Sequence, residues 1–260
     1  MASSVDYKMK NIKYRSESLK TYFSNNRIRW DQFYESERKA IEKIWVGEAP
    51  AILDIGCGCG GLGLALQERF DACNYTGIEI NDQAAEYATS LNPKAKIYSN
   101  DFLAIDDSEL RPESFDFVFS LSCIDWQLNL DAMLKKAWSM TKPGGYFVAS
   151  FRLTQEPSVN DARHSYQFIN FEGKMEGEIA PYVVLNAKEL MGMIRRLEAA
   201  YVYAYGYYGA PSATAVTPFK KLCFGVFAIQ KPINYHGYGL LRAELELPQE
   251  FQTSMLDFLR

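Results

Sequence analysis

Residues 53–61 read Leu-Asp-Ile-Gly-Cys-Gly-Cys-Gly-Gly, in which an apolar strand runs directly into a glycine-rich turn. The apolar run over 51–55 predicts a buried parallel strand, and a helical pattern begins at Leu62. Glycines within the turn allow tight backbone conformations and leave room for a ligand beside the main chain. Because the first turn of a helix carries unpaired N–H groups, the segment predicts a site for a nucleotide-like molecule.

Two motifs overlap in this turn. Gly56, Gly58 and Gly61 satisfy the G-x-G-x-x-G spacing of a dinucleotide-binding turn. The same residues also form Asp54-x-Gly56-x-Gly58-x-Gly60, which resembles motif I of the class I S-adenosylmethionine-dependent methyltransferases. The turn by itself leaves both cofactors open.

Later segments favour the methyltransferase pattern. Glu79 follows the turn by about twenty residues, the separation expected of a carboxylate that accepts ribose hydroxyls, and both cofactors have that ribose. Asp101-Phe102 ends a third strand and looks like the family's adenine-binding pair. The strand over 115–120 and the Lys-Pro-Gly-Gly turn over 142–145 are also similar to motifs of this family. The resemblance is strong over residues 50–152 and looser over 187–232.

The strand pattern and the resemblance together predict an α/β fold with a doubly wound, seven-stranded, mostly parallel sheet whose last strand is antiparallel. A helical pattern over 186–197 and β-rich runs over 199–208 and 222–230 fit the end of that sheet. Parallel strands are expected near 51–55, 75–80, 95–99, 115–120 and 145–151. The expected organisation is an N-terminal helical lid (1–48), a methyltransferase core (49–232) with an insertion after strand five (152–185), and a C-terminal extension (233–260).

Composition limits the classes of protein. The chain has 260 residues, of which 48% are hydrophobic, enough for one α/β domain with a full core. Its five cysteines are scattered, and the Cys57-x-Cys59 pair lacks a second pair of ligands, so we expect neither a disulfide framework nor a metal site. The sequence shows no signal peptide and no run of ~18 apolar residues. These features predict a cytoplasmic protein without a membrane partner.

A nucleic-acid partner is not expected. The net charge is −4, and the basic residues over 8–29 are interspersed with acids instead of forming a stripe. Residues 120–123 read Ser-Leu-Ser-Cys, where related enzymes that methylate base amino groups carry an Asn/Asp-Pro-Pro-aromatic tetrad. The predicted substrate is therefore a small molecule, with a basic peptide as the alternative.

The resemblance implies S-adenosylmethionine as cofactor, with S-adenosylhomocysteine as product. It implies that the glycine turn lies under the methionine part, that Glu79 holds the ribose, and that Asp101 and Phe102 hold the adenine. The predicted cofactor-binding residues are Asp54, Gly56, Cys57, Gly58, Gly60, Glu79, Ile80, Asp101, Phe102 and Ser120. An NAD-linked oxidoreductase and a cofactor-binding protein of this fold without catalysis are the two alternatives.

The predicted reaction is in-line transfer of the methyl group to an O or N nucleophile, which depends mainly on alignment. The acceptor site is expected from the aromatic-rich segment over 10–48, from the insertion over 152–185, which is too long for a simple connection, and from the segment over 201–218. The predicted substrate-binding residues are Tyr22, Trp30, Trp126 and Arg152.

A hydroxyl or ammonium nucleophile must also lose a proton, which requires a general base. The chain has two histidines, and His164 lies in the predicted insertion. Asp125 is the other candidate, because residues 120–126 resemble the family segment Ser-Asn-x-Val-Leu-His-Trp with Asp125 in place of the His. Asp125 could instead bind a cationic or hydroxylated substrate, or cap a helix. The C-terminal extension, with a loop over 234–239 and a helix over 248–259, either covers the sheet edge or meets a second subunit of a homodimer.

Overall fold

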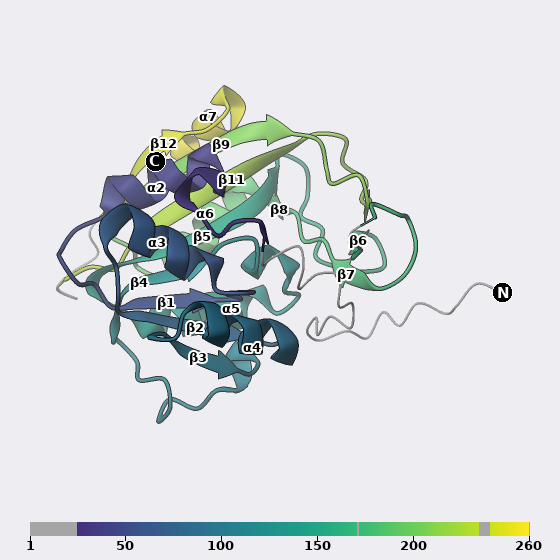
Figure 1. Ribbon diagram of the computed structural model, residues 1–260. Coiled ribbons are helices and arrows are strands. Elements are labelled where there is room, and N and C mark those ends of the chain that lie inside the picture. Colours follow the sequence, from purple (N-terminus) through teal and green to yellow (C-terminus); the bar gives the residue numbers. More distant parts are fainter. Residues whose placement is uncertain (1–24, 171, 234–239, 260) are drawn as a thin grey trace.

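The computed structural model describes residues 25–170, 172–233 and 240–259. Its centre is a nine-stranded sheet in the order β12-β9-β11-β5-β4-β1-β2-β3, with β8 paired to β5 (Figure 1). The strands are β1 (Ile52–Ile55), β2 (Tyr75–Glu79), β3 (Lys96–Ser99), β4 (Phe115–Ser120), β5 (Thr141–Thr154), β8 (Leu185–Asn186), β9 (Tyr201–Gly209), β11 (Leu222–Gln230) and β12 (Arg242–Glu246).

One half of this sheet is parallel. β1 pairs in parallel with β2 and β4, and the pairs β2–β3 and β4–β5 are also parallel. All four residues of β1 are buried, which explains its continuous apolar run. The carboxyl ends of these strands lie along one edge of the sheet, so the turn after β1, the acid ending β2 and the segment after β4 come together there.

The other half carries the predicted reversal. β11 runs antiparallel to both β5 and β9, as expected for the last core strand. The predicted count of seven strands was too low, because β8 and β12 are added to the core. β8 has only two residues, and β12 alternates charged and apolar residues at the sheet edge, so neither stands out in the sequence.

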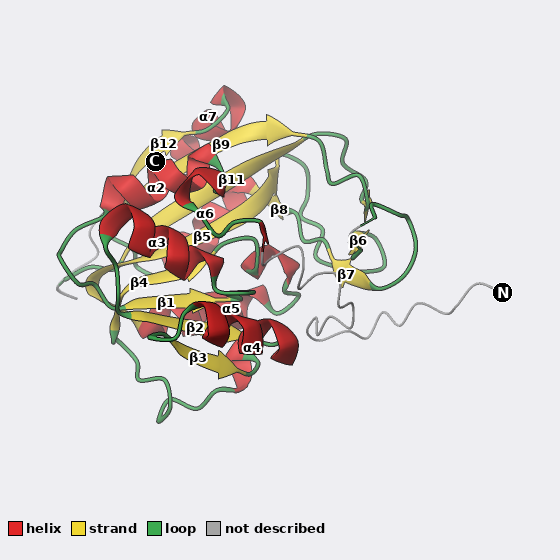
Figure 2. Ribbon diagram, viewed as in Figure 1, coloured by secondary structure: helices red, strands yellow, loops and turns green. Residues whose placement is uncertain are grey.

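Helices cover both faces of the sheet (Figure 2). One apolar cluster joins a face of the sheet to α5 (Leu130–Met140), α6 (Ala187–Arg196) and α7 (Gln249–Leu259). The other joins the opposite face to α2 (Glu35–Ile44) and α3 (Gly61–Phe70), and α4 (Asp82–Leu91) contributes Ala88 to it. The doubly wound architecture predicted from the sequence is therefore confirmed. The C-terminal extension covers the sheet edge, where β12 pairs with β9 and α7 buries Phe251 and Met255.

The insertion and the segment after β9 together form a small separate sheet. β6 (Tyr166–Phe168) pairs antiparallel with β7 (Ile179–Pro181) and with β10 (Ala215–Val216). The chain passes from β6 to β7 through Gly173 and Gly177, both with positive φ, a conformation that glycine adopts without strain. In Figure 1 this sheet lies beside β8, at the end of the central sheet where the parallel strands terminate.

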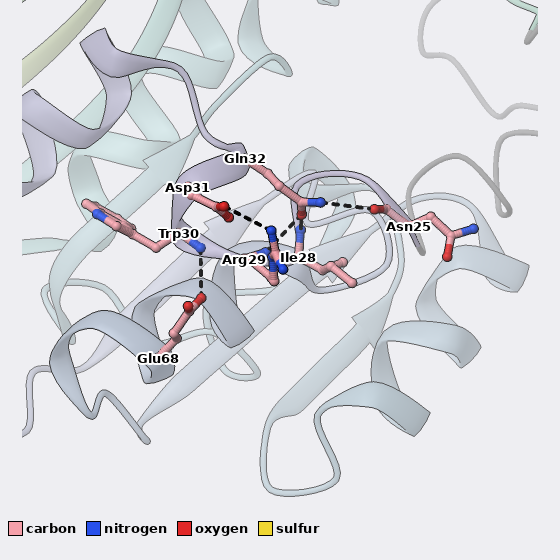
Figure 3. A network of polar contacts seen from close by, with 7 residues as sticks. All are labelled: Asn25, Ile28, Arg29, Trp30, Asp31, Gln32 and Glu68. Atoms are coloured by element: carbon pink, nitrogen blue, oxygen red, sulfur yellow. Dashed lines mark hydrogen bonds and ion pairs between the residues drawn. The ribbon is translucent and has the colours of Figure 1, made fainter.

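The N-terminal segment is fixed to α3 before α2 begins. The 3₁₀ turn η1 spans Trp30–Gln32, and the Trp30 N–H donates to Glu68 of α3 at 2.9 Å. Gln32 accepts from the backbone N–H groups of Ile28 and Arg29 and donates to the carbonyl of Asn25 (Figure 3). No helix in the described part of the chain has the length and hydropathy to cross a membrane.

Candidate active site

A cavity of about 650 Å³ opens where the parallel strands end. Most of the predicted cofactor-binding residues line it, including the turn after β1 and the ends of β2 and β3. The lining members are Asp54, Gly56, Cys57, Gly58, Glu79, Ile80, Asp101 and Phe102. Gly60 and Ser120 lie outside the lining: Gly60 is the N-cap of α3, and Ser120 is fully buried at the end of β4.

The glycine turn needs its glycines. Gly56, Gly58 and Gly60 have φ of 75°, 55° and 77°, in the left-handed region that glycine adopts without strain. A Cβ on Gly56 would stand 2.4 Å from the Cys123 sulfur. The N–H groups of Gly56 and Cys57 both donate to the carbonyl of Ile78, at 2.8 and 3.0 Å. These bonds hold the turn against β2.

Glu79 closes this arrangement from the end of β2. Its Oε2 accepts from the Gly58 N–H at 2.8 Å and its Oε1 from the Asn81 N–H at 2.9 Å. Burial raises the pKa of this carboxyl, while its backbone donors act in the opposite direction. Each carboxylate oxygen can accept more than one hydrogen bond. Glu79 therefore braces the turn and still has acceptor capacity at the cavity wall.

Asp54 lies in the floor of the cavity. Its Oδ2 accepts from the Tyr75 hydroxyl at 2.6 Å. Burial raises its pKa to about 7, against the lowering effects of the Tyr75 hydrogen bond and of the positive charge on Arg27. The Tyr75 contact was not predicted, because nothing in the spacing of the two residues signals it.

Asp101 and Phe102 reach the cavity from the turn after β3. Asp101 Oδ1 accepts from the Leu103 N–H at 3.0 Å and caps the 3₁₀ turn Phe102–Ala104. The ring of Phe102 is buried, with the Lys136 Nζ 5.1 Å from its centroid. The cap fixes the direction of the chain, so that the carboxylate and the ring are presented at the same wall.

A second cavity of about 430 Å³ adjoins the first along β5 and β11. Five residues line both cavities: Tyr34, Ser122, Trp126, Gln167 and Ser212. They come from the N-terminal segment, the turn after β4, the insertion and the segment after β9. The three segments expected to build an acceptor site thus all contribute to the boundary between the cavities.

Asp125 and Arg152 form a buried ion pair in the second cavity. Arg152 Nε lies 3.3 Å from Asp125 Oδ2, and Arg152 Nη1 donates to the Asp125 carbonyl at 2.8 Å. The guanidinium carbon lies 3.8 Å from the Tyr182 ring centroid and 4.3 Å from that of Trp126. Burial raises the pKa of Asp125, and the charge of Arg152 opposes that rise.

Two predicted site residues lie away from both cavities. His164 has a largely exposed side chain, 69% accessible, with Nδ1 3.4 Å from Asp161 Oδ2, and it lines neither cavity. Trp30 is buried against Phe70, with ring centroids 5.3 Å apart, and lines neither cavity either. Polar contacts of the Asp161 turn hold His164 outward, and apolar packing draws Trp30 onto α3. Tyr22 lies outside the described residues.

Arg27 and Glu37 were missed by the sequence analysis. Both Glu37 oxygens accept from the Arg27 guanidinium, at 2.8 and 3.0 Å, and the Arg27 carbon lies 4.4 Å from the Phe33 ring centroid. Arg27 lines the larger cavity and Glu37 the smaller one. Ten residues separate the pair, and no motif marks such spacing. In the described ranges, no group of three His, Cys, Asp or Glu side chains is arranged to hold a metal ion.

Comparison with known proteins agrees with this geometry. Residues 53–149 match the family described as "Methyltransferase domain". Sterol 24-C-methyltransferase of Clavispora lusitaniae is 30% identical over 135 residues, covering 49% of this chain and 35% of the relative. (S)-tetrahydroprotoberberine N-methyltransferase of Eschscholzia californica is 26% identical over 131 residues, covering 49% and 37%. The matched region thus spans about a third of these relatives.

The structural comparison extends the likeness to the fold. A SAM-dependent methyltransferase of Methanosarcina mazei superposes with a TM-score of 0.57 at 20% identity, covering 78% of this chain and 99% of the other. The sheet order and this structural likeness show a fold that the chain shares with SAM-dependent methyltransferases. Residues 53–149, the part of the chain that matches the methyltransferase domain family, include the glycine turn, Glu79, Asp101 and Phe102.

Proposed function

We propose that this protein binds S-adenosylmethionine in the larger cavity and transfers its methyl group to an O or N nucleophile of a small molecule. The observation that carries the proposal is the convergence of the glycine turn, Glu79 and the Asp101–Phe102 pair on one cavity of about 650 Å³. Small-molecule and cofactor sites typically have volumes of about 300–1,000 Å³, and this cavity falls within that range.

The residues present fit this cofactor. The turn offers close main-chain approach for the methionine part, Glu79 offers acceptor oxygens for ribose hydroxyls, and Asp101 with Phe102 offers an acceptor and an apolar ring for the adenine. When bound, the cofactor supplies a methyl group already activated on a sulfonium. The contribution of the protein is then to hold the acceptor in line and to exclude water.

We further propose that the acceptor occupies the second cavity. Its boundary residues face both cavities, so an acceptor there would lie beside the methyl donor. Trp126 and Arg152 remain the proposed acceptor contacts. Asp125 is the proposed group for receiving a proton, because burial moves its pKa upward, toward the range useful to a general base at neutral pH. Both named relatives methylate small molecules by their names, one at carbon and one at nitrogen, which supports the substrate class but not the acceptor atom.

The division into lid, core and C-terminal extension is likewise proposed. The segment ending in α2 contributes Arg27, Phe33 and Tyr34 to the larger cavity, which supports its role as a cover over the cofactor. The cytoplasmic location and the homodimer remain predictions.

Calorimetric titration with S-adenosylmethionine, S-adenosylhomocysteine and NAD tests the proposed cofactor. We expect both adenosyl ligands to bind at micromolar concentration and NAD not to bind. Binding of NAD alone would make the protein an oxidoreductase, and binding of none of the three would refute the cofactor assignment. Transfer of a radiolabelled methyl group to a panel of small hydroxyl and amine acceptors then separates an enzyme from a protein that only binds the cofactor.

A further inference from the structure

Arg152 is held more rigidly than a substrate-binding arginine on a loop would be. It projects from β5 and is 95% buried, with its guanidinium between the rings of Trp126 and Tyr182. Its Nη1 and Nε are both directed to Asp125, one to the carbonyl and one to the carboxylate. The planar guanidinium is therefore fixed before any ligand arrives, which reduces the entropic cost of forming a new hydrogen bond.

The third nitrogen of the Arg152 guanidinium, Nη2, is available for a hydrogen bond to a ligand. Within the described residues, Nη2 of Arg152 has no hydrogen-bond partner, and it is not among the fully buried unpartnered atoms. Arg152 itself lines the second cavity. An arginine has five N–H donors and no acceptor, so an unpaired edge at a cavity calls for an oxygen on the ligand.

The other residues that line the second cavity indicate the chemistry of the rest of the ligand. The second cavity is lined by the aromatic rings of Tyr34, Trp126, Tyr182, Tyr207 and Phe224. Its two carboxylates each lie against an arginine, Asp125 against Arg152 and Glu37 against Arg27, so their negative charges are compensated. Asp125 Oδ1 has no hydrogen-bond partner among the described residues, but this atom is itself fully buried and not exposed to the cavity. The environment suits a flat apolar skeleton that carries one oxygen acceptor.

Resting on the proposed function, we propose that Arg152 is the specificity-determining contact of the acceptor cavity and binds a carbonyl or carboxylate oxygen of an aromatic small molecule. Asp125 then has a positioning role as well, since it holds Nε and Nη1 and leaves Nη2 toward the ligand. The methylated atom is another group of the same molecule. The anchor fixes the molecule by one end, so that the nucleophile can be aligned.

Three probes of similar ring size test this anchor: benzamide, benzoate and toluene. Their affinities are measured by ligand-observed NMR titration of the full chain with S-adenosylhomocysteine present and absent. We expect benzamide or benzoate to bind at least about tenfold more tightly than toluene, the gain expected for a hydrogen bond to a charged donor. The stronger of the two oxygen probes distinguishes a neutral carbonyl from a carboxylate.

Substitutions of Arg152 test whether the preference for the oxygen-bearing probes depends on this side chain. Arg152→Met should reduce the advantage of the oxygen probes to about threefold or less, and Arg152→Lys, which keeps the charge but loses the fork, should reduce it partly. Arg69→Met is the matched control, because Arg69 also pairs with a carboxylate, Glu42, and lies over an aromatic ring, Phe70, but lines neither cavity. Circular dichroism verifies that each variant is folded. If Arg152→Met does not fold, the order of the three probe affinities in the wild-type protein still tests the proposal.

Equal binding of the three probes to wild type, binding of none, or an unchanged preference in a folded Arg152→Met variant would overturn the anchor. Binding of S-adenosylhomocysteine without an oxygen preference would overturn the anchor and leave the proposed function intact. An Arg152-dependent preference in a protein that binds no adenosyl ligand would overturn the proposed function and leave the anchor in place.

Discussion

Asp54 makes the folded protein less stable as the pH rises toward neutrality. The carboxyl is buried, and its pKa is about 7 in the folded chain against an ordinary value of 3.8. Between these two pH values the folded chain binds more protons than the unfolded chain, so the free energy of unfolding falls as pH increases. A difference of about three pH units, at 1.36 kcal/mol each, corresponds to at most about 4 kcal/mol at a pH above 7.

Asp54→Asn removes this dependence while keeping size and an acceptor for the Tyr75 hydroxyl, 2.6 Å away in the wild type. Urea denaturation followed by circular dichroism, at about pH 5 and about pH 8, gives the free energy of unfolding of each protein. Relative to the wild type, we expect the free energy of unfolding of the variant to rise by about 2–3 kcal/mol between pH 5 and pH 8, because about two of the three pH units of the shift fall between these conditions. Asp131→Asn, on the exposed side of α5, controls for the substitution itself. A difference between variant and wild type that is the same at both pH values would refute a raised pKa at Asp54.

Three further substitutions probe the cavity and its cover. Glu79→Gln should raise the dissociation constant of S-adenosylhomocysteine by about ten- to a hundredfold in calorimetry, because an amide can accept from only one of the Gly58 and Asn81 N–H groups; unchanged affinity would remove Glu79 from the site. Gly61→Ala would bring a Cβ 2.0 Å from the Arg27 carbonyl oxygen, so we expect a loss of about 1–3 kcal/mol in stability and weaker cofactor binding. Gly192→Ala is its control, since the added carbon makes only an ordinary contact there, 3.4 Å from Phe258, and an equal loss in both variants would contradict the steric explanation. Trp30→Ala should lower the free energy of unfolding by about 3 kcal/mol without changing cofactor affinity, because the Trp30 ring packs on Phe70. Weaker cofactor binding at unchanged stability would instead show that Trp30 belongs to the binding site.

Much of the cofactor site could be predicted because its residues belong to local motifs. The turn over 56–60 needs glycine where φ is positive, Glu79 ends the largely buried strand β2, and Asp101 follows β3 by two residues. In a parallel sheet, the ends of adjacent strands meet at one edge. The sequence order of these motifs therefore also predicted their neighbourhood, and the structure brings Glu79, Asp101 and the turn to one cavity.

The acceptor side was less predictable because its contacts join distant segments. The sequence offered both His164 and Trp126 as site residues, yet of the two only Trp126 lines a cavity. The pairing of Arg27 with Glu37 and the packing of Arg152 between Trp126 and Tyr182 have no periodicity that a sequence displays.

The sequence by itself determined the parallel core, the glycine turn and the order of the cofactor motifs, since backbone conformation and burial along a strand are local properties of the chain. Tertiary structure alone decided which side chains face the second cavity. It turned His164 to solvent, buried Trp30 on α3 and joined Asp125 to Arg152, because long-range packing and charge pairing select among residues that local patterns leave equivalent.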